Sequence, residues 1–199
     1  TLDGTFLENG GGTVQTAGNI VTNGDTITFA SAVTLTGNVL LDTTGSGNVA
    51  GAAISLNTVN GAQTLTLDAG TGGAITTNAI GAVTPLTGLL ITDSGSVHFQ
   101  STVAVGSGGL DVTSGGAVTF DNTVSTSGGG NVEITHGGLL TMAAIADFTL
   151  DGTFLENGGG TVQTAGNIVT NGDTITFASA VTLTGNVLLD TTGSGNAVG

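Results

Sequence analysis

The sequence predicts an all-β protein, a parallel β-solenoid (β-helix) with about 21 residues per coil and three short strands in each coil. Three observations support this. Short runs of alternating apolar and polar residues recur at a nearly constant step, one long segment is repeated without change, and 37 of the 199 residues are glycine. A short unit of this kind can bury its apolar face only against neighbouring units, which is why such periods are typical of solenoids.

The long repeat spans a quarter of the chain. Residues 1–48 recur without change at 149–196, an offset of 148 residues. Identity over 48 residues indicates a tandem array. We therefore expect residues 1–199 to form one continuous solenoid and to be a window of a longer array of 148-residue units.

The short period is set by a motif of two apolar residues around one polar residue. It occurs at 27–29, 54–56, 97–99 and 118–120, and in weaker form at 75–77 and 140–142. Most steps are 21 or 22 residues, so we expect seven coils per unit, about 4.8 Å apart. Residues at the motif's third position are expected to stack inward: Phe29, Leu56, Phe99, Phe120, Met142 and Phe177.

A second set of apolar pairs precedes the glycine-rich turns and is expected to form another inner wall. These pairs are Val39/Leu41, Leu65/Leu67, Leu89/Ile91, Leu110/Val112 and Val132/Ile134. Val, Ile, Thr and Phe in period-2 alternation, broken by Gly, Asn and Asp, are typical of strands and turns. An antiparallel sandwich is the alternative fold, but it does not require a constant short step.

Charge excludes several classes of function. The chain has no Lys or Arg and 14 Asp or Glu residues, for a formal net charge of −14. Without cations it cannot neutralise phosphates, so nucleic acid is not expected as a partner. No apolar run approaches the ~20 residues of a membrane-spanning helix, so no transmembrane segment is expected. Cysteine is absent, which excludes disulfides and thiolate metal sites.

The segment TITFASAVTLTGNVLLDTTGSGN, with its looser echoes AISLNTVNGAQTLTLDAGTGG and AVTFDNTVSTSGGGNVEITHGG, resembles the repeats of filamentous-haemagglutinin-like proteins. These are very large secreted bacterial adhesins that form right-handed β-helical rods. The resemblance covers nearly the whole chain and implies an extracellular rod with adhesive or matrix roles. It implies no catalytic residue. The chain departs from that family in lacking every Lys and Arg and in repeating perfectly.

Carboxylates are the first candidates for chemistry. Asp42, Asp68, Asp93 and Asp151 come at strand ends just before glycine, where aspartate commonly caps a turn by accepting backbone hydrogen bonds. Stacking of the coils would also align such residues into a column about 5 Å apart, which could recruit Ca²⁺. Asp42, Asp68 and Asp93 are therefore the candidate metal ligands, and calcium is the one cofactor that the sequence suggests.

The remaining titratable residues suggest no enzyme. His98 is expected on an outer strand face and His136 in a turn, both solvated, while Asp121 and Glu133 are single acids on polar faces. The sequence contains no G-x-S-x-G motif or triad-like cluster. Lyases of acidic glycans need cations, which the chain lacks. We therefore expect no catalytic and no cofactor-binding residue.

Ice binding is not expected. Thr-x-Thr pairs at 26–28, 34–36 and 64–66 resemble an ice-binding face, but the following wall carries no threonine in register.

Neither end of the chain has the polar cap that normally closes a solenoid. We therefore expect an acidic structural protein that forms a stiff extracellular or cell-surface filament, by head-to-tail self-association or as a tandem array. The alternative is the stalk of a large secreted adhesin, stabilised by calcium, with a surface glycan or matrix as a partner.

Overall fold

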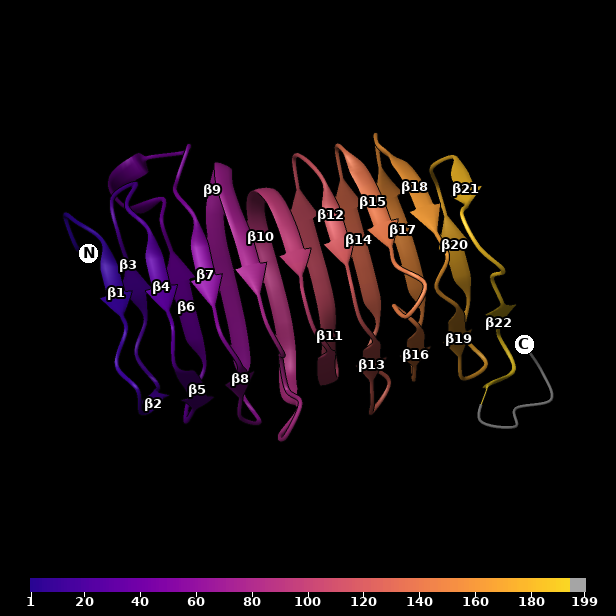
Figure 1. Ribbon diagram of the computed structural model, residues 1–199, viewed down its shortest axis with the longest axis horizontal. Coiled ribbons are helices and arrows are strands. Elements are labelled where there is room, and N and C mark those ends of the chain that lie inside the picture. The colour runs from indigo at the N-terminus through magenta and orange to yellow at the C-terminus, as the bar shows by residue number, and fades with distance from the viewer. Residues whose placement is uncertain (194–199) are drawn as a thin grey trace.

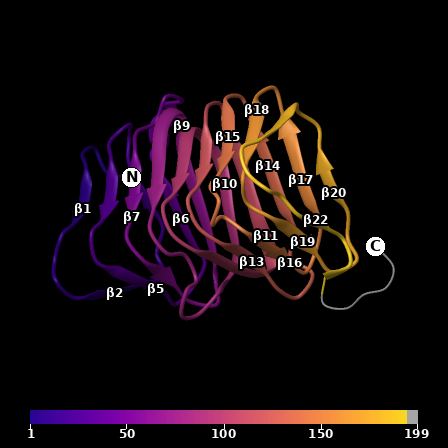
Figure 2. The same ribbon diagram turned by 45° about the vertical axis from the view of Figure 1, so that its right-hand side comes forward.

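The chain winds into a parallel β-solenoid of about 8 turns with about 22 residues per coil in the computed structural model, which describes residues 1–193. Strands make up 57% of the residues and helix 2%, the latter a short 3-10 turn, η1 (Gly45–Gly47). The predicted fold class is thus confirmed. Residues 194–199, which include the last part of the long repeat, lie outside the described residues. Figures 1 and 2 show the coils stacked in sequence order from one end of the rod to the other.

The sides of the rod are three faces of parallel strands, which the chain visits in turn, and the longest strands continue around a corner from one face to the next. The first face contains β1 (Phe6–Glu8), β4 (Ile27–Phe29), β7 (Ile54–Leu56), the ends of β9 (Thr64–Thr77) and β10 (Leu86–Phe99), β12 (Val118–Phe120), β15 (Leu139–Met142), β18 (Thr161–Thr164) and β21 (Val181–Leu183). The second face contains β2 (Thr13–Thr16), β5 (Ala32–Leu35), β8 (Val59–Asn60), a bridge at Ile80, the start of β11 (Val103–Ser114), β13 (Val124–Thr126), β16 (Phe148–Leu150), β19 (Ile168–Thr170) and β22 (Leu189–Asp190). The third face contains β3 (Ile20–Val21), β6 (Val39–Asp42), the starts of β9 and β10, the end of β11, β14 (Val132–His136), β17 (Phe154–Gly158) and β20 (Ile175–Phe177).

The core is a column of side chains along the rod's interior. Alternation places every second residue of a strand inside, as the buried–half-buried–buried pattern of β4 and β12 shows. On the first face the inward column is confirmed for Phe29, Leu56, Phe99, Phe120 and Met142. The Phe99 and Phe120 rings stack with their centroids 4.7 Å apart. The second inner wall is confirmed on the third face, where the predicted apolar pairs are in register and buried.

The expected place of Phe177 is wrong. Phe177 pairs with Glu156 on the third face, whereas its copy Phe29 lies on the first face. The whole long repeat is displaced in this way: β1, β2 and β3 lie on the first, second and third faces, but their copies β17, β18 and β19 lie on the third, first and second.

The displacement follows from the length of the repeat unit. At about 22 residues per coil, 148 residues make between six and seven turns. The copy of β1, β17, lies on the third face instead of the first, two of the three faces further along the winding, so the unit makes six and two-thirds turns. The expectation of seven whole coils is therefore wrong. Successive units are rotated by a third of a turn about the rod axis.

Two glycines show why the corners tolerate few other residues. Gly51 has a φ of +60°, and a Cβ there would lie 2.0 Å from the carbonyl oxygen of Ala69 in the next coil. Gly109 has a φ of +71°, and its Cβ would lie 2.3 Å from the carbonyl oxygen of Asn131. Glycine at these positions permits both the left-handed backbone and the close approach of successive coils.

Candidate functional site

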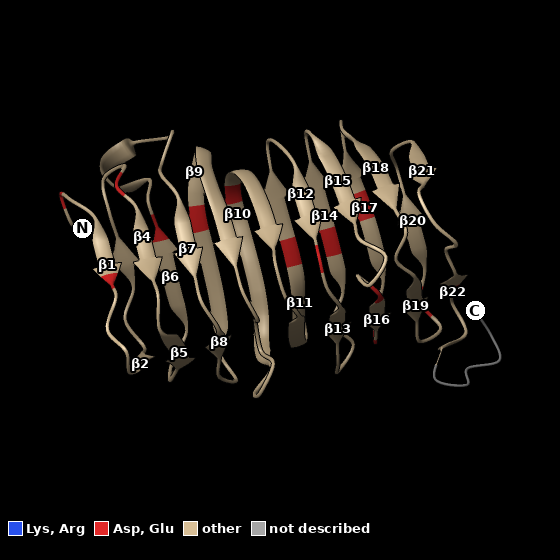
Figure 3. Cartoon of the chain, in the orientation of Figure 1, with Lys and Arg blue, Asp and Glu red and all other residues tan. Residues whose placement is uncertain are grey.

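The predicted aspartate column exists on the third face. Asp42 pairs with Asp68, and Asp68 pairs with Asp93, so the three residues occupy one position on three successive coils. Acidic residues appear along this face in Figure 3. Asp42 Oδ1 accepts hydrogen bonds from the Thr44 N–H at 2.6 Å and its hydroxyl at 2.7 Å, and Asp68 Oδ1 accepts one from the Gly70 N–H at 3.1 Å. These contacts are those of turn caps.

Calcium binding at the aspartate column stays a prediction. Within residues 1–193, no group of three or more His, Cys, Asp or Glu side chains is placed so that it could hold one metal ion. The turn-capping contacts of Asp42 and Asp68 explain their position before glycine without an ion.

A pair of acidic residues also lies on the third face, in the coils that follow the aspartate column. Asp111 of β11 pairs in register with Glu133 of β14. Burial and, after it, the charge of Glu133 raise the pKa of the Asp111 carboxyl above its ordinary value of 3.8. The structure thus brings together two acids that appear isolated in the sequence.

Asp111→Asn is expected to raise the melting temperature (Tm) at pH 7. Because the pKa of Asp111 is higher in the folded than in the unfolded chain, its ionised form opposes folding at neutral pH, and this effect disappears as the pH falls below about 4. The gain should not exceed about 2–4 °C, the shift that 1 kcal/mol gives in a chain of this size, because Asp111 is mostly exposed and solvent screens its charge. Thermal melts at pH 7 and pH 3 test this, and a gain of equal size at both values would contradict it. Glu133→Gln should lower the Asp111 pKa measured by NMR.

The two histidines have different surroundings. His98 lies on the outer surface as expected, but its Nε2 is 2.7 Å from Asp121 Oδ2, with both side chains close to half exposed. Asp121 belongs to the next coil, so sequence spacing alone did not indicate this pair. An exposed side-chain contact of this kind contributes little to stability.

His136 is buried, so its expected place in a solvated turn is wrong. It ends β14, where alternation directs Val132, Ile134 and His136 inward. Nδ1 lies 2.8 Å from the carbonyl oxygen of Gly138, which can only accept, so Nδ1 carries a hydrogen. Nε2 lies 2.8 Å from Glu156 Oε1 on the next coil, and both side chains are fully buried. Each group is therefore the buried hydrogen-bond partner of the other.

Glu156 also contacts the coil that follows. Ser179 donates its backbone N–H to Glu156 Oε2 at 2.9 Å and its hydroxyl to Oε1 at 2.7 Å. His136, Glu156 and Ser179 therefore form a polar column that joins three successive coils. We call it the His–Glu–Ser column. It crosses the boundary between the repeat units, because Glu156 belongs to the second copy of the long repeat and His136 precedes it.

Glu8 is the copy of Glu156 and lies at the N-terminal edge of the rod. It has the same contacts with the following coil: Ser31 donates its N–H to Oε2 at 3.0 Å and its hydroxyl to Oε1 at 2.9 Å. In place of the histidine that contacts Glu156, the backbone N–H of Gly10 donates a hydrogen bond to Glu8 Oε1 at 2.8 Å. Desolvation raises the pKa of Glu8, but the hydrogen bonds from Ser31 and Gly10 outweigh it and hold this pKa below its ordinary value of 4.5.

Comparing the two copies of the long repeat shows which side chains are left exposed at each end of the rod because no further coil covers them. We define the N-terminal edge as residues 1–24 (β1 to β3) and the C-terminal edge as residues 175–192 (β20 to β22). Leu2 at the N-terminal edge is 44% exposed, while its covered copy Leu150 is 3% exposed. Leu183 at the C-terminal edge is 61% exposed, while its covered copy Leu35 is 4% exposed. Both edges therefore expose core residues that another coil would bury.

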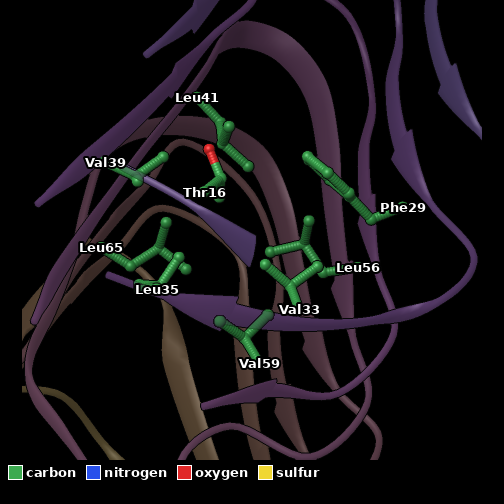
Figure 4. Close-up of a pocket in the computed structure, with 9 residues that line it drawn as sticks. All are labelled: Thr16, Phe29, Val33, Leu35, Val39, Leu41, Leu56, Val59 and Leu65. Atoms are coloured by element: carbon green, nitrogen blue, oxygen red, sulfur yellow. The ribbon is translucent and has the colours of Figure 1, made fainter. Parts of the chain in front are cut away.

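The interior holds no room for a ligand near the N-terminal edge. A cavity of about 10 Å³ lies there between the first coils, and Figure 4 shows its lining, in which the hydroxyl of Thr16 is the one polar group. A space of this size holds at most one water molecule, and an apolar cavity stays dry.

The fold and the duplicated coils define a tandem-repeat β-solenoid protein. Comparisons with protein-family models, curated proteins and solved structures found no match. Among the described residues, no helix has the length and apolar character needed to cross a membrane.

Proposed function

We propose that this protein is a structural one, which builds a stiff extracellular or cell-surface filament from stacked solenoid coils. The observation that carries the proposal is that the two copies of the long repeat have the same sequence but differ in burial. Residues of the long repeat are buried where a coil covers them and exposed where none does, as Leu150 and Leu2 show. Stacking another coil on either edge would bury these side chains and pair the free backbone groups of the edge strands.

The internal boundary between units supports a tandem array in particular. At this boundary the solenoid continues through β16 to β19 without a change in strand pairing, and the rings of Phe148 and Phe154 lie 5.6 Å apart across it. The same junction could recur at every unit of a longer array. The net charge of −14, with no Lys or Arg, would keep such rods apart in solution.

The second candidate is the stalk of a large secreted adhesin of the filamentous-haemagglutinin-like kind. The resemblance of the coils in sequence favours it, and the rod would serve to hold a binding domain away from the cell. A stalk and a filament require the same rod. They differ in whether the rod ends in a domain that binds a glycan or matrix component.

The length of tandem arrays tests the filament proposal. Six and two-thirds turns at about 4.8 Å per turn give about 32 Å per unit. Proteins with one, two and three additional units should therefore lengthen by this amount at each step in electron micrographs, with constant width and a ~4.8 Å axial reflection. Particles that widen rather than lengthen would contradict the proposal. The same micrographs taken after chelation would test calcium at Asp42, Asp68 and Asp93.

A further inference from the structure

The N-terminal edge differs from an ordinary open sheet edge because it presents a carboxylate toward the interior. Glu8 stands at the inward position that is fully buried in its copy, Glu156. Any coil that covers the N-terminal edge must therefore enclose Glu8. Enclosing a carboxylate without an opposite charge or sufficient hydrogen bonds is costly.

The internal boundary shows how one coil meets this requirement. Ile134 of β14 pairs with Glu156, and His136, two residues further, reaches Glu156 Oε1 with Nε2 at 2.8 Å. Gly158, the copy of Gly10, pairs with His136 in the ladder. In this covered copy the N–H groups of Gly159 and Gly160 donate to the His136 carbonyl oxygen at 3.1 and 3.3 Å, and Glu156 is bonded by His136 and Ser179. The contact between the Gly10 N–H and Glu8 therefore has no counterpart at the covered boundary. A histidine in the covering coil replaces it.

The C-terminal edge of a second copy offers a different group. A second copy that continues the winding places its β20 over β1, and the register of the internal boundary then sets Phe177 over Glu8 and Ser179 in the position of His136. The single hydroxyl hydrogen of Ser179 is already donated to Glu156 at 2.7 Å. Glu8 would be enclosed with no partner in the covering coil.

We propose that Glu8 makes the N-terminal edge selective for its covering coil. The coil that it accepts is formed by residues 117–148 of another repeat unit, which bring a histidine to Glu8, and the coil that it rejects is the C-terminal edge of a second copy. This inference rests on the proposed function, a rod of stacked coils, and specifies which coils can be joined. In such a rod, the His–Glu–Ser column determines which coil precedes the start of each repeat unit.

The rejected junction is tested by Glu8→Gln in the full chain. The amide has the size of the carboxyl group and no charge, so head-to-tail association should become easier. Sedimentation velocity across a concentration series should give half-association at a concentration at least tenfold lower for Glu8→Gln than for the unmodified chain. Asp3→Asn is the matched control, since it removes one charge from an exposed position of the same edge. No shift for Glu8→Gln, or an equal shift for both variants, would overturn the proposal.

The accepted junction is tested by placing a second copy of residues 117–148 directly before Thr1 of the full chain. This order reproduces the sequence around residue 148 and adds one histidine to the two already present. Imidazole ¹⁵N–¹H spectra should show the added ring protected from solvent exchange, as expected for His136, and Glu8→Gln should alter its signals but not those of His98. An added ring that exchanges as fast as that of His98 would contradict the proposal.

The two proposals can fail separately. Tandem arrays that do not lengthen would remove the filament function even if the added histidine pairs with Glu8. Arrays that lengthen as expected while the added histidine remains exposed would leave the filament function and remove the role of Glu8.

Discussion

His136→Ala is expected to lower the free energy of unfolding of the C-terminal coils by about 3–5 kcal/mol, the loss typical of breaking a buried charge pair from one side. The imidazole and Glu156 are both fully buried. Removing the imidazole leaves Glu156 enclosed with hydrogen bonds from Ser179 alone. Urea denaturation with hydrogen exchange, which resolves coils that open separately, measures this loss.

Two variants serve as controls for His136→Ala. Glu8→Ala removes the same glutamate from the uncovered copy, where no histidine is present, and should lower the free energy of unfolding much less than His136→Ala does, because water can solvate the groups left behind. His136→Leu combined with Glu156→Leu removes both polar groups and should recover most of the loss. A loss from His98→Ala as large as that from His136→Ala would contradict the argument, because His98 pairs with Asp121 in solvent.

Phe154→Ala is expected to cost about 3–5 kcal/mol, as do most deletions of a buried aromatic ring. Phe154 lies between Phe148, 5.6 Å away, and Phe177, 5.2 Å away, with no exposed surface. Its removal would open a cavity at the boundary between the units, where coils on both sides hold the surrounding atoms in place. The same denaturation experiment measures the effect.

Phe6→Ala is the matched control for Phe154→Ala. Phe6 is the same residue in the same local sequence, but it is only partly buried and contacts one ring, that of Phe29 at 5.1 Å. Water already reaches its uncovered side, so its removal should cost about 1–2 kcal/mol. Equal losses for the two variants would mean that the covering coil adds nothing to the stability of the repeated segment.

Much of the fold could be predicted from the sequence because strand alternation is a local property. Val118, Thr119 and Phe120 alternate apolar and polar side chains, and the structure places Val118 and Phe120 inside. The position of Phe177 could not be predicted in this way. It depends on the number of turns between the two copies, and the loops between strands vary too much in length for residue counts to give fractions of a turn.

The candidate site was only partly predictable for a related reason. Asp42 and Asp68 each follow an apolar pair directly, so their register could be predicted. Asp93 comes one residue later and reaches the same position through a register shift after Ile91. The burial of His136 had a signal in the sequence, the alternation of Val132, Ile134 and His136, but glycines directly after it favoured a turn. The partner of His136 is Glu156, and no local pattern indicates a contact with the next coil.

The third-of-a-turn rotation between units determines how neighbouring rods could meet. In an array, any surface group of the unit, such as the His98–Asp121 pair, would return to the same side only after three units, or about 96 Å. Two arrays lying side by side could then match the same contact no more often than this. The copies of any one surface group would therefore point in three directions around the rod, so no single side of it would carry that group in every unit.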